Sequence, residues 1–138
     1  MMNKLIKKIS LAIGLSTFAV AVCAAELVVI VNPANPATSM TSAQASQFFL
    51  GKSPMFTPVD QAESSPIRTE FYKKICDKDP SEVKAIWSKL VFTGKASAPK
   101  EYHSNAEVKK AVAANPTGIG YIEVSAVDST VKVVTTLH

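Results

Sequence analysis

The chain has 138 residues, of which 47% are hydrophobic and 19% are charged, and its formal net charge at pH 7 is +4. This length allows one compact domain with one core but is too short for two lobes. Most of the excess positive charge lies in the first eight residues, so it gives no support for nucleic-acid binding.

Residues 1–25 have the layout of a secretory signal peptide. Three lysines precede an uncharged, mostly apolar run at residues 9–22, and small residues follow that run. We predict export and cleavage after Ala25, which leaves a periplasmic domain of residues 26–138 with a net charge of about +1. The apolar run is shorter than the roughly 20 residues that span a bilayer, which argues against an uncleaved anchor. No second hydrophobic stretch of that kind follows it, so no stable membrane insertion of the mature chain is expected. A bulky Val22 in front of Cys23 argues against a lipoprotein.

The mature chain is predicted to begin with a strand and a helix. Residues 27–31 form a continuous apolar, β-branched run, which is typical of a strand covered on both faces. Thr41 and Gln44 have the spacing of a capping box, and Gly51 suits the left-handed position after the helix. The buried face of this helix is predicted to consist of Ala45, Phe48 and Phe49.

A second strand at residues 56–60 leads into a polar turn and a helix that ends near Cys76. Ser65 is a good N-cap residue, and Pro66 suits the first helical position. Cys76 is the one cysteine of the mature chain, so no disulfide can form within it. It is either a buried small apolar residue or an exposed thiol that pairs between chains, and its spacing from Phe71 favours burial.

The next helix has apolar residues at the i, i+3, i+4, i+7 and i+8 positions of an amphipathic helix. These residues are Val83, Ile86, Trp87, Leu90 and Val91. We predict that the lone Trp87 belongs to the core and is not a platform for a ligand. Residues 95–103 are predicted to form a polar loop.

The last elements are a short helix and two strands. Ser104 and Glu107 predict a second capping box at the start of the helix, and the strands are predicted at residues 121–124 and 131–136. The resulting order, β-α-β-α-α-α-β-β, indicates an α/β protein with a single three-layer-like lobe built on a small mixed sheet.

No catalytic or metal-binding motif is visible. His103 and His138 have no second His, Cys or Asp at the spacing of metal ligands. No nucleophile elbow, phosphate-binding loop or Cys–His pair occurs either. Glu63 and Glu70 flank the central turn, but acids near a helix start usually complement the helix dipole. We therefore expect neither an enzyme nor a cofactor.

Residues 59–72 contain the candidate binding site. A strand that leads into a capped helix places Arg68 beside backbone N–H groups at the positive end of the helix dipole. Such an arrangement can bind an anion. The same features occur in any well-capped surface helix, so both interpretations stay open.

Three segments resemble the phosphate-binding proteins of bacterial ABC transporters, in the periplasmic-binding-protein-like superfamily. Residues 47–52 read Gln-Phe-Phe-Leu-Gly-Lys, close to the family's Phe-Leu-Gly-Lys signature. Residues 61–71 align with the family's oxyanion turn, Arg-x-x-Gly-Ser-Gly-Thr-Arg-x-x-Phe, and residues 116–121 align with Pro-Gly-x-Ile-Gly-Tyr. The resemblance implies one lobe of a type II periplasmic binding protein, with phosphate or a related oxyanion as the ligand.

The oxyanion turn departs from the family at three positions. Ser65 and Arg68 match the family, whereas Gln61, Pro66 and Ile67 replace an arginine, a glycine and a threonine. These changes remove a charged fork, a backbone donor and a hydroxyl. At roughly 1.5–3 kcal/mol for each unmet hydrogen bond to a charged group, phosphate affinity would fall by several powers of ten.

Two functions follow from this resemblance. The first is a periplasmic solute-binding module for phosphate or a similar oxyanion, which serves an ABC transporter or a sensor. Its candidate ligand-binding residues are Ser64, Ser65, Arg68 and Ile67 (through its backbone N–H), together with Thr38 and Ser39 from a neighbouring loop. The second is a single-lobe accessory domain that binds an envelope protein and no small ligand.

Overall fold

The computed structural model describes residues 26–137; the predicted signal peptide and its cleavage site lie outside the described residues. The strands are β1 (Leu27–Val31), β2 (Thr57–Gln61), β3 (Lys100–Tyr102), β4 (Gly118–Glu123) and β5 (Lys132–Leu137). The helices are α1 (Ser42–Phe49), α2 (Pro66–Phe71) with a π-helical continuation η1 (Tyr72–Cys76), α3 (Pro80–Phe92), α4 (Asn105–Ala114) and a 3-10 turn η2 (Val124–Ala126).

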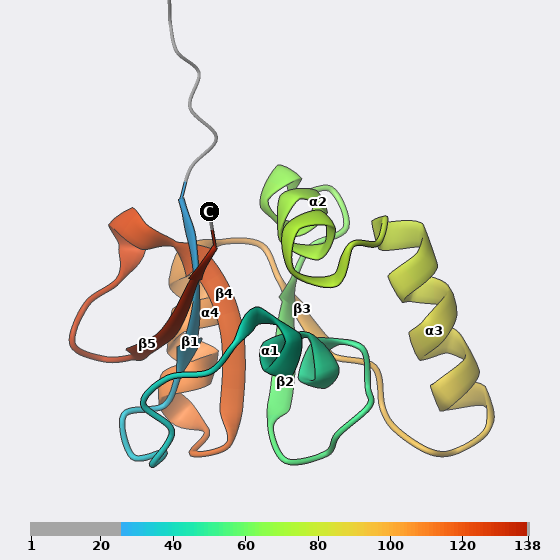
Figure 1. The fold of residues 1–138 in the computed structure, drawn as a ribbon, viewed down its shortest axis with the longest axis horizontal. Helices are drawn as coiled ribbons and strands as arrows, with labels where there is room; N and C mark the ends of the chain where they lie inside the picture. The colour runs from blue at the N-terminus through green and yellow to red at the C-terminus, as the bar shows by residue number, and fades with distance from the viewer. Residues whose placement is uncertain (1–25, 138) are drawn as a thin grey trace, which may run out of the picture.

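The strands form one mixed sheet in the order β3-β2-β4-β1-β5. β1 runs antiparallel to β4 and β5, whereas β2 runs parallel to β3 and β4. Helices α1, α2 and α3 lie toward one face of the sheet and α4 covers the other, which gives three layers (Figure 1). The predicted α/β lobe is confirmed.

Strand β1 shows how alternation divides the core between the two faces. All five of its residues are buried, as predicted for a strand covered on both sides. Leu27, Val29 and Val31 pack with residues of α1, α2 and α3, whereas Val28 and Ile30 pack against α4. Because successive side chains of a strand point to opposite faces, one apolar run contributes to the hydrophobic core on each face of the sheet.

Strand β3 corrects the predicted order of elements. It lies within residues 95–103, which were predicted to form a polar loop. β3 is only three residues long and is stabilised by parallel pairing with β2, a contact between segments about 40 residues apart. A polar strand of three residues is too short to show a hydrophobic period. Its conformation depends on the strand with which it pairs.

Of the two predicted capping boxes, the one at the start of α1 is confirmed in full and the one at the start of α4 in part. The Thr41–Gln44 capping box forms, and Ala45, Phe48 and Phe49 are buried. The second capping box forms only in part: the Ser104 hydroxyl accepts from the Glu107 N–H, but the Glu107 carboxylate accepts from the N–H of His103, one residue too early.

Helix α3 is less buried than its pattern predicts. Trp87 is in the core, as expected, and its indole N–H donates to the Phe49 carbonyl at 2.8 Å. Val91, which was predicted to be buried, is 47% exposed. The reason is that α3 stands beyond the edge of the sheet, where only Val83 and Trp87 are fully covered (Figure 1).

Cys76 is half-buried and packs against the core on the α1 face. Burial raises the pKa of its thiol to about 12, so the thiol stays protonated at neutral pH.

Within residues 26–137, every helix is too short or too polar to span a bilayer.

Two glycines in left-handed conformation form a matched test of packing around α3. Gly51 and Gly94 have φ values of +72° and +73°. A Cβ at Gly51 would overlap Leu90 Cδ1 and lie 3.1 Å from the Trp87 ring, whereas a Cβ at Gly94 would meet nothing within 4 Å.

We expect Gly94→Ala to lower the free energy of unfolding by about 1–2 kcal/mol, the cost of the left-handed backbone. Gly51→Ala should lower it by about 2–4 kcal/mol, because overpacking adds to that cost. Urea unfolding followed by circular dichroism measures both. Equal losses in the two variants would contradict the packing of α3 against this turn.

Candidate functional site

Arg68, the centre of the predicted binding site, is buried and held by the chain's own groups. It is 4% exposed, and its Nη1 donates to the Gln61 carbonyl at 2.9 Å and to the Glu101 carboxylate at 3.0 Å. Its Nη2 lies 3.8 Å from Asp60 Oδ2. The guanidinium therefore already faces two carboxylates and a carbonyl.

The sheet register explains why both carboxylates lie at Arg68. Asp60 of β2 and Glu101 of β3 are direct partners in the parallel pair. Like charges opposite one another destabilise a sheet. A cation between them removes that repulsion, so Arg68 has a structural role that requires no ligand.

Asp60 is the most constrained of these charged groups. It is 3% exposed and accepts hydrogen bonds from the hydroxyl of Tyr72 at 2.7 Å, from the hydroxyl of Tyr121 and from the Gln61 N–H at 2.9 Å. Burial raises the pKa of Asp60, although the Tyr121 hydrogen bond and Arg68 oppose that shift. Burial and the nearby Asp60 also hold the pKa values of Tyr72 and Tyr121 well above the ordinary value, which keeps both hydroxyls protonated as donors.

Burial alone would lower the pKa of Arg68, but Asp60 and Glu101 outweigh burial and raise it, so the guanidinium stays charged. Among the described residues, one polar atom of this group is unpaired: the buried Nε–H of Arg68 has no hydrogen-bond partner. Glu101 is the exposed member of the cluster, with 43% of its side chain accessible to solvent.

The predicted helix N-terminus offers fewer donors than expected. Ser65 is the N-cap residue and Pro66 occupies the first turn, as predicted, but the Ser65 hydroxyl makes no capping hydrogen bond. The backbone N–H of Arg68 donates to the Ser65 carbonyl, so it is not available to an anion.

The other predicted ligand-binding residues are not all brought together. Ser64 is exposed beside Ser65, and Ile67 is half-buried against the core. Thr38 is exposed, and Ser39 lines a separate pocket with Met55 and Phe56, beside α1. The structure thus keeps Ser64, Ser65, Ile67 and Arg68 in one segment and places Ser39 in a different cavity.

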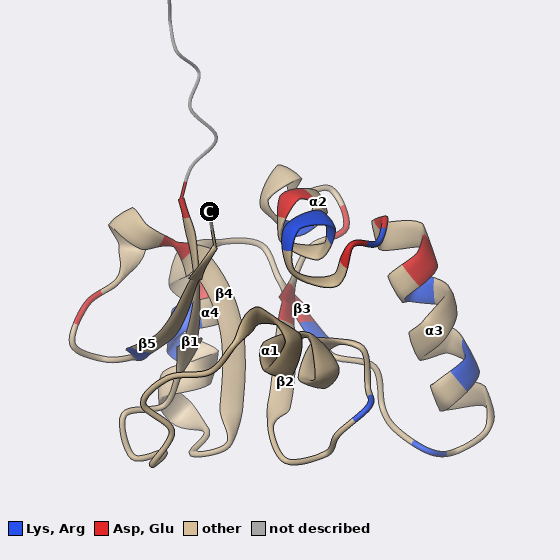
Figure 2. Ribbon diagram, viewed as in Figure 1, with Lys and Arg blue, Asp and Glu red and all other residues tan. Residues whose placement is uncertain are grey.

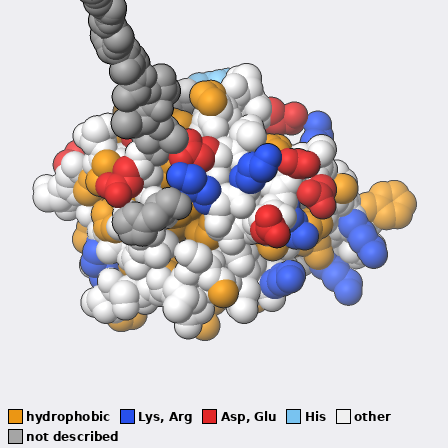
Figure 3. All heavy atoms as spheres, turned by 45° about the horizontal axis from the view of Figure 1, so that its top comes forward, with side chains coloured by type: hydrophobic (Ala, Val, Ile, Leu, Met, Phe, Trp, Pro, Cys, Tyr) orange, Lys and Arg blue, Asp and Glu red, His pale blue; other side chains and the backbone are white. Residues whose placement is uncertain are grey.

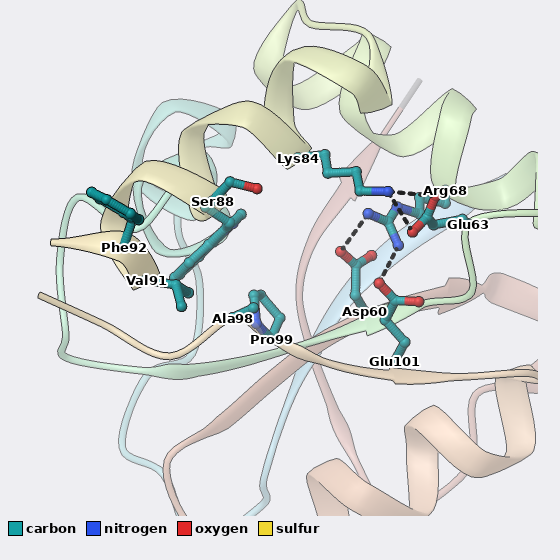
Figure 4. Close-up of a pocket in the computed structure, with 11 residues that line it drawn as sticks. Asp60, Glu63, Arg68, Lys84, Ser88, Val91, Phe92, Ala98, Pro99 and Glu101 are labelled. Atoms are coloured by element: carbon teal, nitrogen blue, oxygen red, sulfur yellow. Dashed lines mark hydrogen bonds and ion pairs between the residues drawn. The ribbon is translucent and has the colours of Figure 1, made fainter. Parts of the chain in front are cut away.

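A cavity of about 450 Å³, here called the α3 pocket, adjoins Arg68 (Figure 4). One end is charged and is formed by Asp60, Glu63, Arg68, Lys84 and Glu101. The other end is apolar and is formed by Trp87, Val91, Phe92, Ala98 and Pro99. The side chains of α3 and of the charged end converge on this space.

The charged end contains a second ion pair. Lys84 of α3 lies 3.3 Å from the Glu63 carboxylate, and both side chains are more than half exposed. Basic and acidic residues occur together on α2 and on α3 (Figure 2), and side chains of both signs lie next to one another on the surface (Figure 3). The charged end of the pocket therefore presents both signs and not one.

The charged end of the pocket fits a general rule for α/β proteins, whereas Ala98 and Pro99 of the apolar end precede β3 and lie at the amino end of that strand. Asp60 and Glu101 lie in the parallel strands β2 and β3, and Asp60 is next to the last residue of β2. Ligands of open α/β sheets bind outside the carboxyl ends of parallel strands. A cavity of a few hundred Å³ with an apolar wall and a few polar groups has the size and composition of a small-molecule site.

Sequence reasoning identified Arg68 but missed the other charged residues of this site, and it interpreted Glu63 only as a complement to the helix dipole. Asp60 carried a signal that could have been used, namely an acid next to the buried Val59 near the end of a strand. Glu101 and Lys84 had no such signal, because both are ordinary surface residue types that tertiary contacts bring to Arg68 and Glu63. No group of three metal-ligating side chains occurs among residues 26–137.

Comparisons with known proteins identify the fold. No family model matches the sequence, and no curated protein matches it. Solved structures do match: an ABC-type phosphate transport receptor from Vibrio cholerae has a TM-score of 0.62 at 22% identity, over 80% of this chain and 46% of its own.

Two further structures are similar to the same extent. A phosphate ABC transporter substrate-binding protein from Clostridium perfringens, solved with bound phosphate, has a TM-score of 0.66 at 20% identity. PstS from Borrelia burgdorferi has a TM-score of 0.62 at 14% identity. They too match 80% of this chain, but only 44% and 47% of their own chains. The chain thus has the fold of one part of a periplasmic-binding-protein-like molecule and spans less than half the length of the structures it matches.

Proposed function

We propose that this chain is a single-lobe solute-binding protein of the periplasm, without enzymatic activity, that takes its ligand in the α3 pocket. One observation carries the proposal: the parallel strands β2 and β3, together with α2, place Asp60, Glu101 and Arg68 at one end of a cavity of about 450 Å³ that has an apolar wall. The fold shared with substrate-binding proteins supports it. An ABC transporter or a sensor in the envelope would be the receiving partner.

Phosphate or a related oxyanion is a weaker candidate ligand. It would bind through Ser64, Ser65, the N–H of Ile67 and Arg68, as the resemblance implies. The names of the structural neighbours favour it, but the charge around Arg68 does not. A dianion would have to displace Glu101 and remain close to Asp60, and in a single open lobe water would weaken each contact.

We expect phosphate to bind with a dissociation constant of about 1 mM or weaker, measured by isothermal titration calorimetry. Glu101→Gln should strengthen that binding about tenfold, because it removes the carboxylate that competes for Arg68. Asp77→Asn is the matched control, since it removes one negative charge at a left-handed residue outside the pocket. Micromolar binding to the unmodified protein would contradict this account of Arg68.

An accessory domain that binds an envelope protein is the second candidate, and one feature of α3 favours it. Phe92 is 92% exposed and lies next to the exposed Val91. Affinity capture from solubilised envelopes tests it: a specific partner that is lost with Phe92→Ser would support docking at this end of α3. Retention of the partner by that variant would exclude this surface.

A further inference from the structure

We propose that the α3 pocket selects small zwitterions with an apolar body, of the class of hydrophobic amino acids and short apolar peptides. This inference rests on the proposed function, because it names the ligand of the same pocket. It starts from the charges that a ligand would meet there.

Asp60 is not available to a ligand, since two tyrosine hydroxyls, a backbone N–H and Arg68 already surround its carboxylate. The charges that remain are two ion pairs, Arg68–Glu101 at 3.0 Å and Lys84–Glu63 at 3.3 Å. The partially exposed members of these pairs are one cation, Lys84, and two carboxylates, Glu63 and Glu101. Figure 4 shows the two pairs next to one another at one end of the cavity.

A ligand of a single sign fits this end poorly. An anion that approaches Lys84 also meets the carboxylate of Glu63, and a cation that approaches Glu101 also meets the guanidinium of Arg68. A zwitterion satisfies both pairs, because its carboxylate can reach Lys84 while its ammonium faces Glu63 or Glu101.

The opposite end accounts for the apolar body. Val91 of α3 faces Ala98 and Pro99 across the cavity, and Trp87 also lines it, whereas the Phe92 ring at this end of α3 points outward. An aliphatic or aromatic side chain placed there would cover part of Val91, which is otherwise 47% exposed. Inorganic phosphate has no group that could make this contact.

The test uses Trp87, the one tryptophan of the chain, as a fluorescence reporter within the pocket. We expect L-leucine to change its emission and to bind with a dissociation constant of about 0.1–1 mM, with calorimetry as the second measurement. Isoamylamine lacks the carboxylate, 4-methylpentanoate lacks the ammonium group and glycine lacks the apolar body. Each should bind at least about tenfold more weakly than L-leucine.

Lys84→Met should weaken L-leucine binding about tenfold or more, whereas Lys89→Met, on the same helix but outside the pocket, should leave it unchanged. If 4-methylpentanoate or isoamylamine binds as tightly as L-leucine, the zwitterion assignment is wrong but a solute-binding pocket stands. If none of these compounds nor phosphate binds, the proposed function itself is overturned.

Discussion

Arg68→Met is expected to lower the free energy of unfolding by about 3–5 kcal/mol, because it leaves the carboxylate of Asp60 buried without its cation. Urea unfolding at pH 7 measures the loss. Glu101→Gln is the matched control: its side chain is 43% exposed, so it should cost less than about 1 kcal/mol. A loss below about 1 kcal/mol for Arg68→Met would mean that the guanidinium is not a structural partner of Asp60.

The loss caused by Arg68→Met should also depend on pH in a defined direction. Burial raises the pKa of Asp60 in the folded protein. A carboxyl group with a raised folded pKa favours the folded state below the pKa of the unfolded chain, and that contribution is lost as pH rises through the folded pKa. Removing Arg68 raises the folded pKa further, so the variant should be less destabilised near pH 4 than at pH 7. An equal loss at both pH values would contradict the coupling.

Trp87→Ala is expected to have the second large effect, a loss of about 3–5 kcal/mol. Trp87 is buried, and its indole N–H donates a hydrogen bond of 2.8 Å to the Phe49 carbonyl of α1. Trp87→Phe keeps most of the apolar contact but leaves that carbonyl unpaired, so it should cost about 1–3 kcal/mol. Urea unfolding followed by far-ultraviolet circular dichroism measures each loss without the tryptophan signal.

The control for Trp87 is Phe92→Ala, on the same helix. Phe92 is 92% exposed, so its truncation should change the free energy of unfolding by less than about 0.5 kcal/mol. Because Trp87 is one of only two fully covered residues of α3, hydrogen exchange of the α3 backbone should accelerate in Trp87→Ala and not in Phe92→Ala. Unchanged exchange in Trp87→Ala would show that other contacts hold this wall of the pocket.

Elements with a strong periodicity could be predicted from the sequence. β1 follows from an unbroken apolar run, and α1 follows from a capping box and the spacing of its phenylalanines. β3 could not be predicted in this way, since three residues carry no period and their conformation depends on pairing with β2. The exposure of Val91 was missed for a related reason: an apolar stripe is only buried where the fold supplies a surface to cover it.

The candidate site was predictable in part. The segment around Arg68 was identified because helix starts and their nearby charges are local in sequence. The identity of its partners was not, since Glu101 lies 33 residues away and meets Arg68 through the β2–β3 register. That register places a second carboxylate opposite Asp60. As a result, the charge of Arg68 is neutralised within the chain, and Arg68 is not free to bind an anion as the sequence predicted.

The most direct test of this account is a crystal structure of the protein grown with about 50–100 mM phosphate, at most about a hundredfold above the expected dissociation constant. That concentration is a stringent challenge to the ion pairs of Arg68. We predict that Arg68 Nη1 stays on the Gln61 carbonyl and that Asp60 remains within ion-pair distance, even if a phosphate is found near Ser65. A phosphate bound directly by a guanidinium that has left both Asp60 and Glu101 would contradict the account.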